Sequence, residues 1–366
     1  MSEARGRVVR CLDEAVAAFE PRQKPFQVGR TVIALGQLSV VLFSSRAHLA
    51  PMTAAGESFT CDGLAQGGIY CVLSEGPATA IVVAVLILVC CGLAPRALGL
   101  MHVWVSFSIA HGIGLPDGGE HVAQVVTLLV AVILLADSRM MAWRSPRGPG
   151  TPFLTGLALA AWWILRLQMS GIYLHSAVAK FGVENWLNGS AMYYIVRDPS
   201  FGASGGVATL MHGATNISLG VAVMTWGSIA VEIAIAVLLL LGARARLAGL
   251  GLAVILHALI ILTIGLWSFG LVMIGAVVIA AAPSFGMGFR AAPRSDGTSD
   301  AVSSDAVGAE LVEGITSRPS GGGAGIVDSC AGGGRDLAVG DEDLAGPGTG
   351  VGSFGGTSHD PRMSGH

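Results

Sequence analysis

Long and nearly charge-free apolar stretches recur between about residue 28 and residue 282 of this chain. A stretch that crosses about 30 Å of hydrocarbon must satisfy its backbone hydrogen bonds internally, because lipid offers no partners. Only 12% of the residues are charged, whereas an average soluble domain has roughly 25%. The sequence therefore predicts an all-α fold, a polytopic transmembrane helical bundle.

The apolar stretches predict about eight spans. Six are expected near residues 28–45, 79–94, 98–114, 121–136, 153–174 and 218–241. The apolar stretch 247–282 is too long for one crossing, and Gly265-Leu266-Trp267-Ser268 in its middle favours a break with an interfacial tryptophan. We expect two helices of about 17 residues there.

Positive charge predicts the orientation, because Lys and Arg accumulate in short cytoplasmic loops. With the N-terminus inside, the inner segments up to residue 294 hold thirteen Lys/Arg and the outer loops hold three, which are Arg46, Lys180 and Arg197. We therefore expect a multi-pass cell-membrane protein with cytoplasmic N- and C-termini. Nothing at the N-terminus resembles a cleaved signal, so the first span is expected to remain as an anchor.

Three regions follow from this division: a cytoplasmic N-terminal segment (1–26), a transmembrane domain (27–285) and a tail (286–366). From about Ala291 the tail is rich in Gly, Ser and Asp, a composition that cannot bury enough apolar surface to fold, and we expect it to be disordered. Residues 291–366 hold 4 Lys/Arg against 11 Asp/Glu. The apolar spans make the lipid bilayer an expected partner. Nucleic acid is not expected as a partner, because no basic stripe occurs elsewhere in the chain.

Two cysteines, Cys61 and Cys71, fall in a polar loop on the side predicted to be outside, where disulfides persist. A disulfide that closes a small loop and a pair of free thiols are both compatible with this spacing. No CxxC motif or Cys/His spacing indicates zinc, so no metal site is predicted.

Ionisable residues inside predicted spans are candidates for function, since an isolated charge costs roughly 2.5–3.5 kcal/mol there. Arg166 and Glu232 are expected at similar depths and could pair, either as a functional pair or as an ion pair that fixes helix register. Arg30 is expected to extend to the inner interface. His257 is compatible with a hydrogen-bonded core residue or a ligand.

The stretch from Gly171 to Gly202 is the most polar part of the transmembrane region. On a continued helix, Tyr173, Ser176 and Lys180 share one stripe and His175 lies on a neighbouring one. Lys180 could act as a general base or bind an anionic group. The alternative is an interfacial lysine within an aromatic belt of Trp186, Tyr193 and Tyr194.

Within this stretch, LHSAVAKFGVENWLNGSAMYY followed by DPSFG resembles the signature of the HTTM domain, the membrane domain shared with vitamin K-dependent gamma-carboxylases. Glu232, the pair Arg244 and Arg246, His257 and LWSFGLVM (266–273) are similar to the later helices of that domain. GRTVIALGQLSVVLFSS (29–45) and the loop with Cys61 and Cys71 look like the B component of the bacterial sporulation-delaying-protein antimicrobial peptide system. The resemblance covers about residues 26–285.

The sporulation-delaying resemblance implies a membrane protein that assists maturation or export of a secreted antimicrobial peptide precursor, together with a partner maturation protein. The carboxylase resemblance implies an alternative, a carboxylase-like or quinone-linked membrane enzyme. Its base would be Lys180 and its cofactor a quinone such as reduced vitamin K. Supporting polar residues would be Tyr173, His175, Ser176, Arg166, Glu232 and His257. We expect no large β-rich domain in the low-complexity residues after the helices, and in this the sequence departs from the carboxylases.

Overall fold

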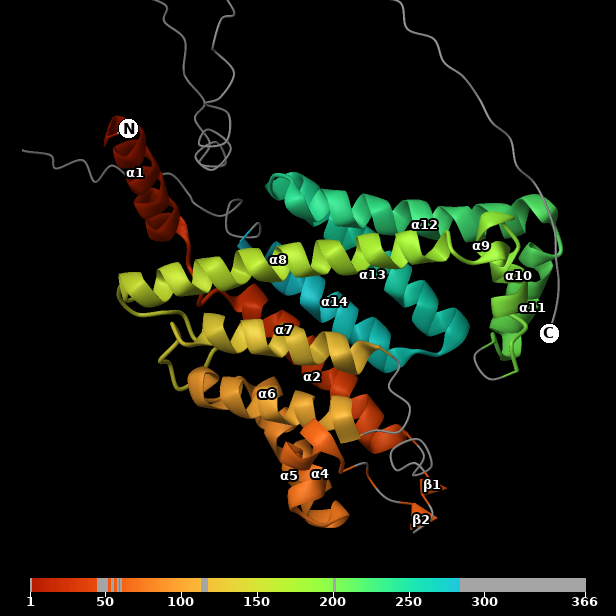
Figure 1. Ribbon diagram of the computed structural model, residues 1–366, viewed down its shortest axis with the longest axis horizontal. Coiled ribbons are helices and arrows are strands. Elements are labelled where there is room, and N and C mark those ends of the chain that lie inside the picture. The colour runs from red at the N-terminus through yellow and green to blue at the C-terminus, as the bar shows by residue number, and fades with distance from the viewer. Residues whose placement is uncertain are drawn as a thin grey trace, which may run out of the picture.

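A computed structural model describes residues 2–44, 52–53, 56–57, 59, 61–112, 118–199 and 202–283. The tail 286–366 and its predicted disorder lie outside the described residues. Within them the fold is all-α, as predicted, apart from a small antiparallel ladder of β1 (Met52–Thr53) and β2 (Gly56–Glu57). Figure 1 shows the longer helices running along one axis.

Every predicted span coincides with a helix. These helices are α2 (Lys24–Phe43), α5 (Glu75–Cys91), α6 (Pro95–Gly112), α7 (Gly119–Leu134), α8 (Pro152–Lys180), α12 (Ser218–Leu240), α13 (Ala243–Ile264) and α14 (Trp267–Ala281). The predicted break in the last apolar stretch is confirmed, because Gly265 ends α13 in the left-handed region at φ 79°. This conformation suits glycine, which lacks a Cβ.

Four of the described helices, α2, α8, α12 and α13, are both long and apolar enough to cross a membrane. The apolar helices α5, α7 and α14 are shorter, with 17, 16 and 15 residues. Several spanning helices in one chain make this a multi-pass membrane protein.

The centre of the bundle is the crossing of α2 and α14, two helices in extensive contact. A Cβ placed on Gly29 would lie 2.6 Å from the carbonyl oxygen of Gly275, and a Cβ on Gly275 would lie 2.6 Å from that of Gly29. Only residues without a Cβ permit so close an approach, as in other membrane helix pairs. Around this crossing, α8 packs on α12 and on α7, and α2 packs on α5.

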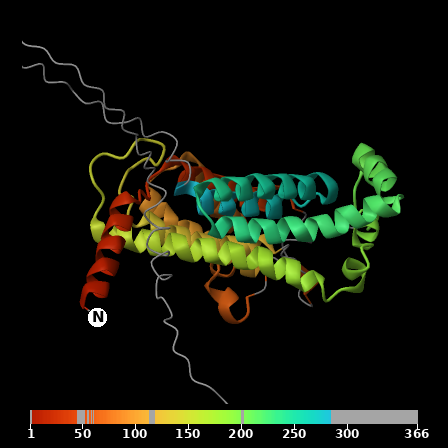
Figure 2. The same ribbon diagram turned by 90° about the horizontal axis from the view of Figure 1, so that it is seen from above.

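Short elements cover the two ends of the bundle. The helices α9 (Glu184–Leu187), α10 (Ala191–Ile195) and α11 (Gly205–Thr215) gather where α8 ends and α12 begins (Figures 1 and 2). At the opposite end, α1 (Ser2–Ala18) lies crosswise to α8 in both views. Between α2 and α5 the chain forms the 3-10 helix η1 (Gly63–Gly67) and α4 (Ile69–Val72).

Candidate functional site

The candidate site lies on a polar seam of α8 that faces α12 and α13. Its members recur every three or four residues, so they share one face of the helix, and each bonds to a neighbouring helix or its end. They are Arg166, Ser170, Tyr173, Ser176 and Lys180. The predicted stripe of Tyr173, Ser176 and Lys180 therefore exists, and α8 continues six residues past the predicted end at residue 174.

At the end of the seam near α9, Lys180 forms an ion pair with Glu232 of α12. Its Nζ lies 2.6 Å from Oε2 and 2.8 Å from Oε1 of Glu232. Nζ also donates to Oγ of Ser176 at 2.9 Å, and this hydroxyl donates to Oε1 of Glu232 at 3.2 Å. The side chains of Lys180 and Glu232 are only 17% and 11% exposed. Low exposure strengthens the attraction between them beyond that of a surface pair.

The indole of Trp186, on α9, covers this pair. Nζ of Lys180 lies 5.1 Å from the Trp186 ring centroid, a distance at which a cation is attracted to the ring face. Nε1 of Trp226 in turn donates to the carbonyl oxygen of Trp186 at 3.1 Å, which ties α9 to α12. The tryptophan expected in an aromatic belt thus contacts the site directly.

Two turns deeper along α8, Tyr173 and His257 form a second buried pair. The Tyr173 hydroxyl lies 2.8 Å from Nε2 of His257 on α13, and the ring of Phe269 stands edge-on to the imidazole. His257 is thus a hydrogen-bonded core residue in this arrangement. Its Nδ1 has no hydrogen-bond partner among the described residues.

The expected pairing of Arg166 with Glu232 is not what the structure shows. Arg166 is fully buried and donates from Nε and Nη2 to the carbonyl oxygen of Leu239, at 3.1 and 2.8 Å. Its guanidinium also lies 4.0 Å from the ring centroid of Trp163. The last carbonyls of α12 lack partners within their helix and carry the negative end of its dipole, which suits a buried cation.

His175 and Arg30 lie apart from this seam. His175 is exposed on the neighbouring stripe of α8, as the spacing predicts. Arg30 is only 1% exposed, so the expectation that it reaches the inner interface is wrong. It belongs to α2, which neighbouring helices enclose, and its guanidinium nitrogens have no hydrogen-bond partner among the described residues.

Sequence reasoning missed a buried polar contact between α2 and α6. Gln37 donates through Nε2 to Oγ of Ser106 at 2.8 Å, and its Oε1 lies 2.8 Å from Nε2 of His102. The helical spacing of His102 and Ser106, four residues apart, was the available signal. Within the described residues, no three His, Cys, Asp or Glu side chains are grouped to hold a metal ion.

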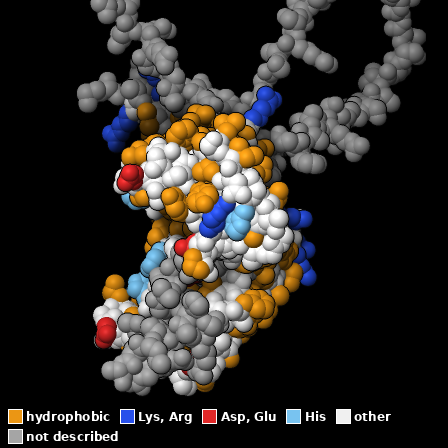
Figure 3. All heavy atoms as spheres, turned by 90° about the vertical axis from the view of Figure 1, so that its right-hand side faces the viewer, with side chains coloured by type: hydrophobic (Ala, Val, Ile, Leu, Met, Phe, Trp, Pro, Cys, Tyr) orange, Lys and Arg blue, Asp and Glu red, His pale blue; other side chains and the backbone are white. Residues whose placement is uncertain are grey.

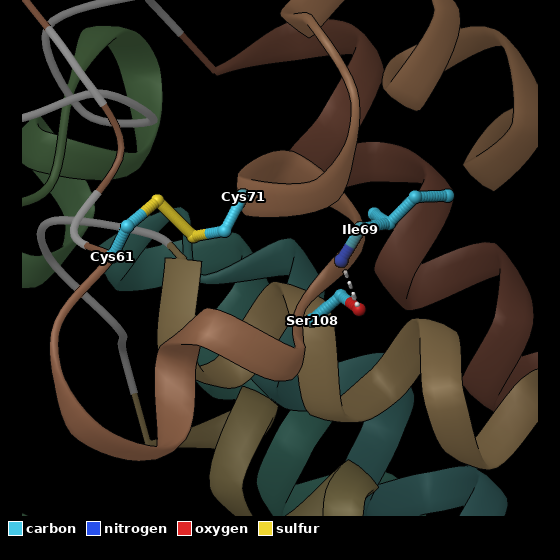
Figure 4. Close-up of a disulfide and its surroundings, with 4 residues drawn as sticks. All are labelled: Cys61, Ile69, Cys71 and Ser108. Carbon is cyan, nitrogen blue, oxygen red and sulfur yellow. Dashed lines mark hydrogen bonds between the residues drawn. A yellow bond between two sulfur atoms is a disulfide. The ribbon is translucent and has the colours of Figure 1, made fainter.

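The loop after α2 carries the two cysteines for which the sequence left a disulfide and free thiols open. The sulfur atoms of Cys61 and Cys71 are bonded, at 2.05 Å (Figure 4). Oγ of Ser108 on α6 accepts a hydrogen bond from the backbone N–H of Ile69 at 3.0 Å, which fixes α4 against the bundle. The disulfide therefore closes a loop that is docked on α6.

The fold and the site together define a multi-pass helical membrane protein with buried polar contacts between its helices. The space-filling view of the α9–α11 end shows few charged side chains among many hydrophobic ones (Figure 3). No family model and no solved structure matches the chain.

Two proteins of Bacillus subtilis (strain 168) are distant homologues of the chain. It is 28% identical to the sporulation-delaying protein SdpB over 279 residues, which are 75% of this chain and 85% of SdpB. It is 32% identical to the uncharacterized protein YitO over 202 residues, 55% of this chain and 65% of YitO. The match thus spans slightly less than two thirds of YitO. The resemblance to the sporulation-delaying system is confirmed as distant homology.

Proposed function

We propose that this chain assists the maturation or export of a secreted antimicrobial peptide of the sporulation-delaying type, together with a partner maturation protein. The homology to SdpB over most of both chains carries this proposal. We expect the peptide precursor to bind at the Lys180–Glu232 pair, which lies at the α9–α11 end of the bundle.

We further propose about eight crossings with both termini in the cytoplasm. In this topology the carboxyl ends of α2 and α8 both face outward. The Cys61–Cys71 loop and Lys180 would then lie on the outer side of the membrane, where an exported peptide is found. The distribution of Lys and Arg, thirteen inside against three outside, supports this orientation. An oxidising exterior would keep the disulfide closed.

The first experiment deletes the gene from its host and measures the mature peptide in the medium. We expect the deletion to reduce the amount of mature peptide at least about tenfold, which corresponds to about 1.4 kcal/mol in a rate. A plasmid that encodes the wild-type chain should restore the mature peptide. A plasmid that encodes the control variant Lys24→Met, changed at an exposed lysine of α2, should restore it as well. Lys180→Met should not. Normal maturation in the deletion strain would refute the proposal.

The alternative candidate is a carboxylase-like or quinone-linked membrane enzyme with Lys180 as base. The observation that favours it is the indole of Trp186, whose ring centroid lies 5.1 Å from Nζ and beside which a hydroxylated ring fits. As a base, Lys180 would have to give up its own proton first, and the group within reach of Nζ is Oε2 of Glu232 at 2.6 Å. Reduced vitamin K, when bound, would supply the acidic hydroxyl.

Lys180→Arg separates the two candidates. Arginine keeps the cation and can pair with Glu232, but it cannot be deprotonated in a protein. If Lys180 binds an anionic group, Lys180→Arg should retain most peptide maturation, whereas Lys180→Met should lose it. If Lys180 is a base, both variants should lose activity although both insert into the membrane at the wild-type level.

A further inference from the structure

The N-terminal helix α1 carries an apolar stripe that the bundle covers only at one end. Val8, Leu12 and Val16 follow one another at intervals of four residues and therefore lie on one face. Val16 contacts α8, since its Cγ2 lies 3.7 Å from a Cβ placed on Gly156. Val8 and Leu12 continue the stripe beyond this contact and are 59% and 58% exposed.

The position of α1 places this stripe at the level of a membrane surface. In Figures 1 and 2, α1 lies crosswise to α8, beside the N-terminal end of that helix, and its own N-terminus points away from the bundle. Phe19, directly after α1, is 9% exposed and packs against Trp162 and Phe26 with ring centroids 5.7 and 6.1 Å apart. When α8 crosses the bilayer, α1 therefore runs in the plane of the membrane, beside the bundle.

The charges of α1 divide along its length. Arg5, Arg7 and Arg10 lie in the outer half and are all exposed, whereas Asp13 and Glu14 lie in the half next to the bundle. Glu3 also lies in the outer half, so the part of the helix that extends away from the bundle has three arginines against one glutamate and is basic overall. An amphipathic helix with a basic end and an apolar stripe binds the interface of an anionic bilayer through both features.

We propose that α1 is an in-plane membrane anchor that binds anionic phospholipid. Val8 and Leu12 enter the boundary between headgroups and acyl chains, while Arg5, Arg7 and Arg10 bind lipid phosphates. The N-terminal segment is then a lipid-binding element of the inner surface and not only a cytoplasmic extension. This inference rests on the placement of α1 and is independent of the peptide substrate.

The test is amide hydrogen exchange of residues 2–18 in the full-length chain, reconstituted into nanodiscs. One set of nanodiscs contains phosphatidylcholine alone, and the other contains equal parts of phosphatidylcholine and phosphatidylglycerol. We expect the anionic lipid to slow exchange in α1 about tenfold or more, and high salt to reverse this effect, because the attraction is electrostatic.

Three variants isolate the two features. The triple change Arg5→Gln, Arg7→Gln and Arg10→Gln should abolish the difference between the two lipid compositions. Leu12→Ser should speed exchange in both. The control Ala17→Ser, at an exposed position outside the stripe, should behave as wild type. Unchanged exchange in α8 shows that each variant is folded. Equal protection of α1 in both nanodiscs and in detergent would overturn the proposal, since α1 would then be covered by protein.

Discussion

Glu232 is bonded to Lys180 and not to Arg166, although both cations lie on the same seam of α8. The carboxylate meets the end of α8, and the guanidinium meets the end of α12. Each helix thus places one charge against the other helix, and these two contacts fix the register of the pair. A shift by one turn would break both contacts and bury unpaired charge.

The charge-swapped double variant Lys180→Glu/Glu232→Lys should be far more stable than either single change. Each single change leaves two like charges facing each other at low exposure, and we expect a loss of about 2 kcal/mol or more. The stability of the single and double variants would be measured by thermal unfolding of the purified proteins in detergent and by their expression yields.

The matched comparison is Arg166→Glu/Glu232→Arg, which should show no rescue because these two side chains do not meet. Rescue by this second swap, or its absence in the first, would contradict the register described above.

The α2–α14 crossing is the helix contact that depends most on glycine, because Gly29 and Gly275 have no Cβ where the two backbones meet. We predict that Gly29→Ala destabilises the chain by about 1–3 kcal/mol, because a new methyl group would overlap the α14 backbone. Gly171→Ala is the control within α8, since nothing lies within 4 Å of its added Cβ. The melting temperatures of the two purified variants should differ clearly, and equal values would argue against the close crossing.

The sequence predicted where the helices lie but not how they shift along one another. Apolar runs located the eight helices expected as spans, and the spacing of Tyr173, Ser176 and Lys180 located their shared face. Periodicity defines a face, whereas axial register depends on packing between helices, so the partner of Arg166 was missed. A backbone carbonyl such as that of Leu239 leaves no signal in a sequence pattern. Arg30 shows the same limit, because apolar content alone does not tell which helix is central.

For the whole molecule, the number of crossings can be tested with fusions at two positions. After Gly148, eight crossings predict four spans and a cytoplasmic reporter, whereas crossing by α2, α8, α12 and α13 alone predicts one span and an external reporter. After Ala203 the two topologies again predict opposite sides. We expect green fluorescent protein to fluoresce at Gly148 and alkaline phosphatase to be active at Ala203. The reverse pattern would exclude the eight-span arrangement.

The length of α8 determines from which side of the membrane boundary a peptide can reach Lys180. Its 29 residues extend about 44 Å, roughly 14 Å more than the hydrocarbon layer is thick. A helix with this mismatch tilts or extends into the headgroups. Extension on the outer side would place Lys180 where water and acyl chains meet. A precursor could then keep a hydrophobic segment dissolved in lipid while its polar segment meets the lysine from the aqueous side.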